Sequence, residues 1–223
     1  MPKHNQPLII AITGSPGSGK STLCRALIAC IPGVLHVDMD DFQTFTSLNH
    51  EQLAAWIEQG SDCNVFNLDP LVQHLRQLKQ GTDDSPDNDS MTGSLKQRSI
   101  ILFESHFGRL HEQTGNLIDL QVWIDTPLDI ALSRNVLQLC RGLSDSVKQQ
   151  PALDQATSAL SWIGDYLNTY LSLVRQTLML QRQHIKATAD LVIDGELPID
   201  RSSQQVREWI QPKLTLPELQ AYL

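Results

Sequence analysis

A glycine-rich stretch between an apolar run and a helix-forming run is the feature that most constrains this chain. The stretch is GSPGSGKST at residues 14–22, and it follows PLIIAIT at residues 7–13. A short, almost entirely apolar run that ends at glycine is typical of a strand buried on both faces of a parallel sheet. Leu23, Leu27 and Ile31 then recur at helical spacing. The order of strand, flexible loop and helix predicts an anion at the helix N-terminus.

The stretch fits the pattern G-x-x-x-x-G-K-[ST] without a gap. Glycines let successive backbone amides converge on phosphate oxygens, Lys20 reaches the terminal phosphates, and the Ser21 hydroxyl can bind Mg²⁺. A plain Gly/Ser turn is the alternative, but the four fixed positions match by chance on the order of one time in a hundred. We therefore expect an ATP site. The residues expected to bind the nucleotide are Gly14, Ser15, Pro16, Gly17, Ser18, Gly19, Lys20, Ser21 and Thr22, here called the phosphate-binding loop.

The rest of the chain alternates between strand-like and helix-like runs. Further strands are expected at residues 34–42, 98–105, 117–127 and 190–194. Further helices are expected at residues 49–59, 68–80, 127–142, 157–189, with a kink at Gly164, and 199–211. Such alternation predicts an α/β fold with a parallel sheet of five strands flanked by helices, in one domain over residues 1–223. Polar stretches at 81–97 and 143–155 predict a mobile surface loop and an interruption of the helices.

Composition excludes several classes of protein. The formal net charge is −8 and the isoelectric point about 5.2, which argues against a binder of nucleic acid or of anionic membranes. The four cysteines form no CxxC pair, so neither a disulfide framework nor a zinc site is expected. No apolar run approaches the roughly 20 residues of a membrane span. We expect a cytoplasmic protein.

Carboxylates follow two neighbouring strands of the predicted sheet. Asp38, Asp40 and Asp41 end the second strand, and Glu104 ends the third. The carboxyl ends of parallel strands form the edge where ligands bind, so these groups are expected near Lys20. Asp40 is expected to orient an acceptor hydroxyl, with a helix N-cap as the alternative role. Asp38 is expected to be structural and Asp41 to be the cap.

A metal is expected at the same edge. Glu104 would be costly to bury unpaired, and Mg²⁺ would remove that cost, with a salt bridge as the alternative. The expected metal ligands are Ser21, Glu104 and Asp40. The aromatic side chains Trp56, Trp123, Trp162 and Tyr166 are expected to be core or lid packing.

Missing motifs narrow the class of phosphate-loop protein. The chain has no N-K-x-D element of a GTPase and no L-S-G-G-Q element of a transporter ATPase. The strand IILFES ends in one carboxylate, Glu104, where an oligomeric ATPase would usually show paired acids. The small size and the polar helical region after the fourth strand favour a small-molecule kinase whose lid, at about residues 135–155, closes over ATP.

An ordered set of segments resembles a known group of kinases. HVDMDDFQTF resembles the second-strand motif of uridine kinase and nicotinamide riboside kinase, with Asp40 in the place of the catalytic acid. SIILFE resembles the family's strand that ends in E-G, although Ser105 replaces the glycine. IDTPLDIALSRN and KATADLVIDG resemble the lid strand with its helix and the last strand. Together, residues 8–195 resemble the uridine kinase, phosphoribulokinase and pantothenate kinase group, which implies a P-loop sheet of order 2-3-1-4-5 with a helical lid.

The resemblance also implies site residues. The implied catalytic residues are Asp40, Lys20, Glu104 and Arg134, the last on the first arginine of the lid pair. Candidate acceptor contacts are Asp69 in NVFNLDP, together with Phe42, His106 and Arg109, which lie where an acceptor would bind. The chain departs from the family at Asn135, Gln138 and Leu139, where charged lid residues are expected. Arg141, Arg182 and Lys186 are candidates to replace that charge.

These features predict an ATP- and Mg²⁺-dependent kinase that phosphorylates a hydroxyl of a small metabolite. A nucleoside or ribosyl compound is the first candidate acceptor. A pantothenate- or glycerate-type kinase, or a P-loop ATPase with a regulatory or assembly role, is the alternative. The sequence indicates no oligomeric state.

Overall fold

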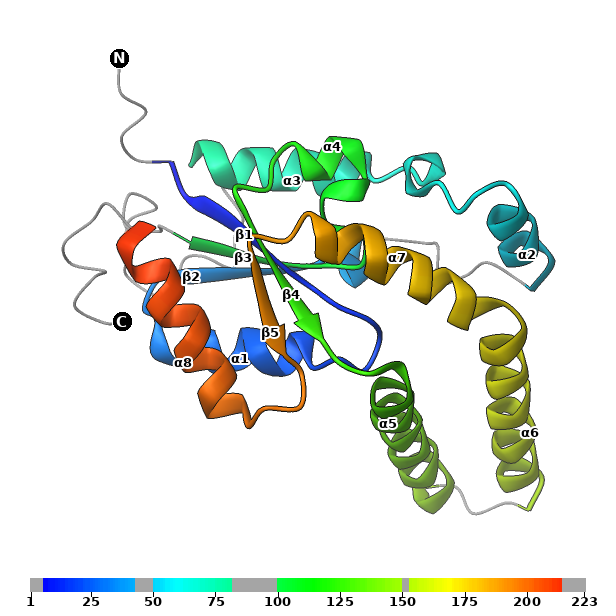
Figure 1. Ribbon diagram of the computed structural model, residues 1–223. Helices are drawn as coiled ribbons and strands as arrows, with labels where there is room; N and C mark the ends of the chain where they lie inside the picture. The colour runs from blue at the N-terminus through cyan, green and yellow to red at the C-terminus, as the bar shows by residue number, and fades with distance from the viewer. Residues whose placement is uncertain (1–5, 43–49, 82–99, 150–152, 214–223) are drawn as a thin grey trace.

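A parallel sheet of five strands forms the centre of the molecule (Figure 1). The structure is a computed structural model, and it describes residues 6–42, 50–81, 100–149 and 153–213. The strand order is β2-β3-β1-β4-β5, with every pairing parallel. The strands are β1 (Leu8–Thr13), β2 (Val34–Asp38), β3 (Ile100–Ser105), β4 (Leu120–Asp125) and β5 (Leu191–Asp194). The fold class and strand order expected from the sequence are confirmed.

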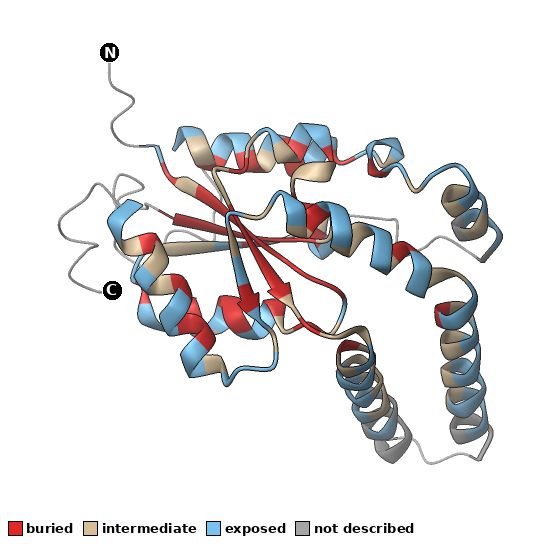
Figure 2. Ribbon diagram, in the orientation of Figure 1, coloured by how far each residue is buried: buried red, intermediate tan, exposed pale blue. Residues whose placement is uncertain are grey.

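Helices cover both faces of the sheet. The helices are α1 (Lys20–Cys30), α2 (His50–Glu58), α3 (Asp69–Gln80), α4 (Glu112–Gly115), α5 (Leu128–Gln149), α6 (Leu153–Thr169), α7 (Arg175–Ala187) and α8 (Ile199–Ile210). In Figure 1, α1 and α8 lie on one face of the sheet, and α3 and α4 lie on the other. The three central strands, β3, β1 and β4, are almost entirely buried between these layers, whereas the edge strands β2 and β5 are partly exposed (Figure 2). This burial explains why the strands are read from the sequence as continuous apolar runs.

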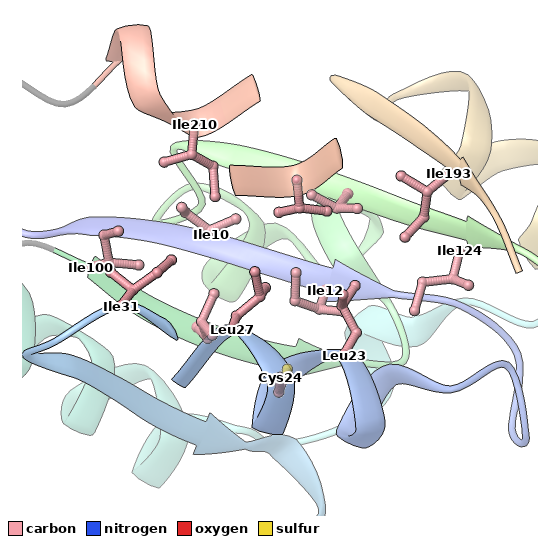
Figure 3. Close-up of a cluster of buried hydrophobic side chains, with 13 residues drawn as sticks. Ile10, Ile12, Leu23, Cys24, Leu27, Ile31, Ile100, Ile124, Ile193 and Ile210 are labelled. Carbon is pink, nitrogen blue, oxygen red and sulfur yellow. The ribbon is translucent and has the colours of Figure 1, made fainter. Parts of the chain in front are cut away.

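Alternate residues of β1 enter two separate hydrophobic clusters. Ile10 and Ile12 pack with Leu23 and Leu27 of α1 and with α8 (Figure 3). Ile9 and Ala11 point the other way, into a cluster that includes the buried leucines of α3. Because successive side chains of a strand face opposite sides, β1 anchors both layers. The rigid end of β1 therefore fixes where the phosphate-binding loop begins.

The helices after β4 extend away from the sheet (Figure 1). The interruption predicted at 143–155 is wrong over its first part, because α5 continues to Gln149. The kink predicted at Gly164 is also wrong, because α6 runs through that residue. A glycine costs a helix only about 1 kcal/mol, which neighbouring turns tolerate. The change in the helix lies instead at the π-helical turn Tyr170–Val174, where Tyr170 is buried.

Two further expectations involve segments that the structure describes in part. Gly81 ends α3 in the left-handed conformation, with φ of 70°, and the rest of the loop predicted at 81–97 lies outside the described residues. The predicted lid, 135–155, corresponds to α5 and the start of α6, and residues 150–152 between them are not described. Among the described helices, none has the length and apolar character needed to cross a membrane.

Candidate active site

The phosphate-binding loop joins the end of β1 to the start of α1 in a conformation that requires glycine. Gly17 has φ of 80° and Gly19 has φ of 103°, a region that residues with a Cβ atom rarely adopt. A Cβ atom on Gly17 would also collide with the backbone carbonyl of Ala131 in α5. Gly19 precedes α1 without any side-chain cap. The first amides of α1 are therefore left for a ligand, as an anion site at a helix N-terminus requires.

Two polar groups of the loop are buried in a way that indicates an anionic ligand. The Lys20 side chain is 8% exposed, and its Nζ donates to the carbonyl of Gly14 over 3.2 Å. Burial lowers the pKa of Lys20, and the negative charges of Glu104 and Asp40 oppose that shift. Ser18 Oγ is buried and has no hydrogen-bond partner among the described residues. An orphaned hydroxyl beside a buried ammonium fits the oxygens of a bound phosphate.

Glu104 lies directly beside this loop. The side chain is 3% exposed, its Oε2 accepts a 2.9 Å hydrogen bond from Ser21 Oγ, and its Oε1 lies 3.1 Å from His36 Nε2. Burial by itself raises the pKa of Glu104, but the hydrogen bonds of His36 and Ser21, with the charge of Lys20, outweigh it and lower the pKa. Glu104 is therefore held as a carboxylate. His36 was missed from the sequence, although it faces the same side of β2 as Asp38, two residues later.

Asp38 and Asp40 divide their roles by geometry. Asp38 Oδ1 accepts from the backbone amide of Asp40 over 2.9 Å and caps the short 3₁₀ helix Met39–Asp41. Asp41 was expected to be the helix cap, but Asp38 takes that role. Asp38 ends β2 in an extended conformation, which is the conformation of an N-cap residue. The Asp40 carboxylate is 53% exposed, and its Oδ1 lies 2.9 Å from His106 Nε2. Asp40 therefore faces the solvent-filled side of the site.

These donors suit a magnesium ion and a polyphosphate. Ser21 and Glu104 offer a hydroxyl and a carboxylate in direct contact with each other, and Asp40 and Asp38 lie close enough to act on the charge of Lys20. Oxygen donors of this kind are the ligands that Mg²⁺ prefers.

A cavity of about 440 Å³ opens in front of the loop. Gly14, Ser15 and Pro16 line one end, together with Asp40 and His106. The remainder of the wall is mostly apolar and includes the aromatic side chains Trp56, Phe107, Trp123 and Tyr166. Trp56, Trp123 and Tyr166, which were expected to serve in core or lid packing, come from α2, β4 and α6 and also line this wall. No sequence spacing marks them as neighbours.

Arg134 lies on another side of the phosphate-binding loop. Its Nη1 donates to the carbonyl of Gly195 over 2.9 Å. It lines a second cavity, of about 250 Å³, with Ser18, Gly19 and Thr22. The structure thus brings Arg134 to the loop but not to the cavity that Asp40 lines. Its catalytic role stays a prediction.

Three residues expected at the acceptor do not line the larger cavity. Phe42 stacks on His74, with ring centroids 5.2 Å apart, and packs against the core. Asp69 is exposed at the first turn of α3. Arg109 binds the Asp190 carboxylate over 2.7 Å and the carbonyls of Thr188 and Asp119. For Arg109 the acceptor role is wrong, because these partners are residues that immediately precede β4 and β5. Among the four candidates, His106 alone lines the cavity.

Two of the three residues considered as replacements for the missing lid charge, Arg182 and Lys186, form ion pairs with the sheet. Arg182 Nη2 and Lys186 Nζ each lie 2.8 Å from the carboxylate of Asp125, at the end of β4. The indole of Trp123 donates to the same carboxylate over 3.1 Å. These cations therefore fasten α7 to the sheet. Arg141 is exposed on α5.

Comparison with known proteins agrees with this geometry. A family model described as the phosphoribulokinase / uridine kinase family matches residues 9–146. The chain is 24% identical over 219 residues to a uridine kinase of Clostridium tetani, covering 92% of this chain and 97% of that protein. It is 30% identical over 148 residues to a uridine kinase of Schizosaccharomyces pombe, covering 60% of this chain and 32% of that protein.

A solved structure titled as a possible uridine kinase from Bacillus stearothermophilus aligns with a TM-score of 0.48 and 16% identity, covering 86% of this chain and 91% of that chain. The family model spans more than half of the chain. The chain therefore belongs to the phosphoribulokinase / uridine kinase family and is a phosphotransferase that acts on a hydroxyl acceptor.

Proposed function

We propose that this protein transfers the γ-phosphate of ATP, in the presence of Mg²⁺, to a hydroxyl of a neutral nucleoside or ribosyl compound. The observation that carries the proposal is the position of Asp40. Its carboxylate lines the same cavity as Gly14, Ser15 and Pro16 of the phosphate-binding loop. A phosphate donor on the loop and an alcohol in the cavity would therefore meet at Asp40.

Each residue has a defined role in this proposal. The loop amides, Lys20 and Ser18 bind the phosphates, and Ser21 with Glu104 and Asp40 would hold Mg²⁺, which neutralises phosphate charge. Asp40 orients the acceptor hydroxyl and takes its proton. As the oxygen bonds to the γ-phosphorus, the bond to the β–γ bridging oxygen breaks and ADP leaves. His106, 2.9 Å from Asp40, positions that carboxylate.

The wall of the cavity favours a neutral acceptor over an acid. Its described lining includes no lysine or arginine, and Asp40 is its one carboxylate. A glycerate or pantothenate carboxylate would meet Asp40 without a compensating cation, which costs free energy in a partly buried site. A flat base can instead stack on Trp56 or Trp123, since stacking on an aromatic ring contributes about 1–3 kcal/mol. The related uridine kinases support the same acceptor class.

The test is ADP release from ATP with Mg²⁺ against a panel of acceptors: uridine, cytidine, nicotinamide riboside, pantothenate and glycerate. We expect a nucleoside or riboside to raise ADP release well above the rate with water alone. The Asp40→Asn variant should lower acceptor-dependent transfer by about 10²–10⁴-fold, the usual contribution of a general base, and should still bind ATP. Asp41→Asn is the matched control, because this exposed neighbour does not line the cavity.

Two results would contradict the proposal. One is ADP release that no acceptor raises above the water background, which is the behaviour of a regulatory ATPase. The other is a preference for pantothenate or glycerate, which would show that a cation outside the described cavity lining pairs with the acceptor carboxylate.

A further inference from the structure

Three side chains of different chemistry meet beneath the phosphate-binding loop. Cys24 comes from α1, His36 from β2 and Glu104 from β3, and one ligand atom from each lies within 4.8 Å of the other two. Cys24 and Glu104 are buried, whereas the His36 side chain is 33% exposed. The cluster therefore has a dry inner end and one opening to solvent, through the imidazole.

We propose that Cys24, His36 and Glu104 form a binding site for a thiophilic divalent cation, Zn²⁺, whose occupancy inhibits the kinase. A thiolate, an imidazole and a carboxylate are the ligand types that bind Zn²⁺ in proteins. Mg²⁺ prefers oxygen ligands and is a poor partner for sulfur and nitrogen. The site is therefore chemically distinct from the magnesium site at Ser21, although the two share Glu104.

The distances are close to those of a tetrahedral zinc centre. With bonds of about 2.3 Å to sulfur and 2.0–2.2 Å to nitrogen and oxygen, ligand atoms lie about 3.3–3.6 Å apart. His36 Nε2 and Glu104 Oε1 already lie 3.1 Å apart. The separations to Cys24 are at most 4.8 Å, so they need to shorten by no more than about 1.5 Å, which a side-chain rotation provides. Water reaching the exposed side of His36 would be the fourth ligand.

Metal binding at this site exchanges a proton for the cation. Burial, followed by the charge of Glu104, raises the pKa of the Cys24 thiol, so without metal the sulfur carries its proton. When Zn²⁺ binds, the S–H bond breaks, the proton leaves to solvent and the sulfur bonds to the metal as a thiolate. No oxidant or reductant is needed. The cation then neutralises the negative charge of the thiolate and of the carboxylate in the buried end of the cluster.

Inhibition follows because Glu104 belongs to both sites. Its Oε2 accepts from Ser21, and its Oε1 lies against His36. A zinc ion on Oε1 withdraws the carboxylate charge from Lys20 and Ser21, which hold the phosphates and Mg²⁺ in the proposed function. The inhibitory effect rests on that proposed function, whereas metal binding itself does not.

The binding test uses Co²⁺ added alone to the apoprotein as a spectroscopic substitute for Zn²⁺. We expect a thiolate-to-cobalt charge-transfer band in the near ultraviolet and the strong visible bands of a tetrahedral site, both removed by Zn²⁺. Cys24→Ala and Cys24→Ser should lose the charge-transfer band. Cys30→Ser and Cys140→Ser, at free cysteines outside the cluster, should keep it. His36→Gln is a second test that leaves the thiol in place, and it should weaken cobalt binding about 10–100-fold.

The activity test measures the Zn²⁺ concentration for half inhibition at fixed ATP, Mg²⁺ and acceptor, with each variant normalised to its own zinc-free rate. Cys24→Ser should require at least tenfold more Zn²⁺ than the wild type or Cys30→Ser. Absence of a thiolate band in the wild type, or a band that survives Cys24→Ser in a protein with an unchanged circular dichroism spectrum, overturns the site.

The two proposals fail separately. A cobalt–thiolate band in a protein that no acceptor activates overturns the proposed function and retains the metal site. Acceptor-dependent transfer in a protein without the cobalt–thiolate band overturns the metal site and retains the proposed function.

Discussion

The phosphate-binding loop and the aromatic cavity lie next to each other but are built in opposite ways. The loop is nine successive residues that run from the end of β1 into the first turn of α1, and its buried polar groups are fixed by backbone and by Glu104. The cavity collects residues from α2, the end of β3, β4, α5 and the π-helical turn with its flanking helices. Its wall is mostly apolar and held by packing.

The contrast suits the ligands proposed for the two regions. A triphosphate presents the same charged oxygens in any kinase, so one short set of amides with one ammonium can serve all of them. An acceptor is recognised by shape and by a few polar groups, so many side chains from separate elements suit that task. Asn135, one of the residues at which the sequence departs from the resemblance, donates to the Tyr166 hydroxyl over 2.7 Å and joins α5 to α6.

Among the variants that compare the two regions, the largest effect is expected on the loop side, from Lys20→Met. The variant keeps the length of the side chain but removes the ammonium proposed to contact the phosphates, so transfer should fall about 10²–10³-fold. Steady-state kinetics with the best acceptor measures the loss. Lys213→Met, at an exposed lysine far along the chain, should leave the rate unaltered. A wild-type rate of transfer in Lys20→Met would show that Lys20 has no role in phosphoryl transfer.

On the cavity side, Trp56→Ala should act on the acceptor and not on ATP. Trp56 lines the cavity and lies 5.4 Å from Phe66, between ring centroids. Loss of one stacking ring should raise the acceptor KM about tenfold, with the ATP KM unchanged. Trp56→Phe, which retains an apolar ring, should fall between Trp56→Ala and the wild type. An equal rise in both KM values would show that the two regions are not separable.

The smallest effect concerns the ion pairs that fasten α7, one wall of the cavity, to the sheet. The Asp125 side chain is 21% exposed, and its partners Arg182 and Lys186 are 36% and 41% exposed, so solvent screens both pairs. Asp125→Asn should therefore cost only about 1 kcal/mol in the free energy of unfolding at pH 7. Urea unfolding measures this loss. Asp165→Asn, on the exposed face of α6, is the control and should cost less.

The ion pairs of Asp125 also make the stability of the protein depend on pH, in a direction that the pKa of Asp125 defines. Burial raises the pKa of Asp125, but the hydrogen bonds of Lys186, Trp123 and Arg182 outweigh it, and the folded-state pKa lies below 3.8. A carboxyl whose pKa is lowered on folding stabilises the protein above its unfolded-state pKa, and this contribution disappears as pH falls through the folded-state pKa. The difference between wild type and Asp125→Asn should thus shrink below about pH 4. A difference that stays constant to pH 2 would refute the ion pair.

The sequence was most informative where the chain folds locally. β1, the loop and α1 form one continuous unit, and Glu104 could be placed because buried parallel strands end at a common edge. Arg109 was misplaced because it lies five residues after Glu104, and after the 3₁₀ turn at Gly108–Leu110 its side chain binds the residues that precede β4 and β5. Gly164 was misread as a kink because one glycine costs a helix only about 1 kcal/mol, and α6 continues through it.

By itself, the sequence determined the parallel sheet, the phosphate-binding loop and the carboxylates at its edge, because each follows from a short run of residues and its period. Only the tertiary structure decided what surrounds them. His36 reaches Glu104 across 68 residues, and Trp56 meets Trp123 and Tyr166 at one cavity. Contacts of this kind depend on how strands pair and helices cross, and these are properties of the packed chain that no local pattern encodes.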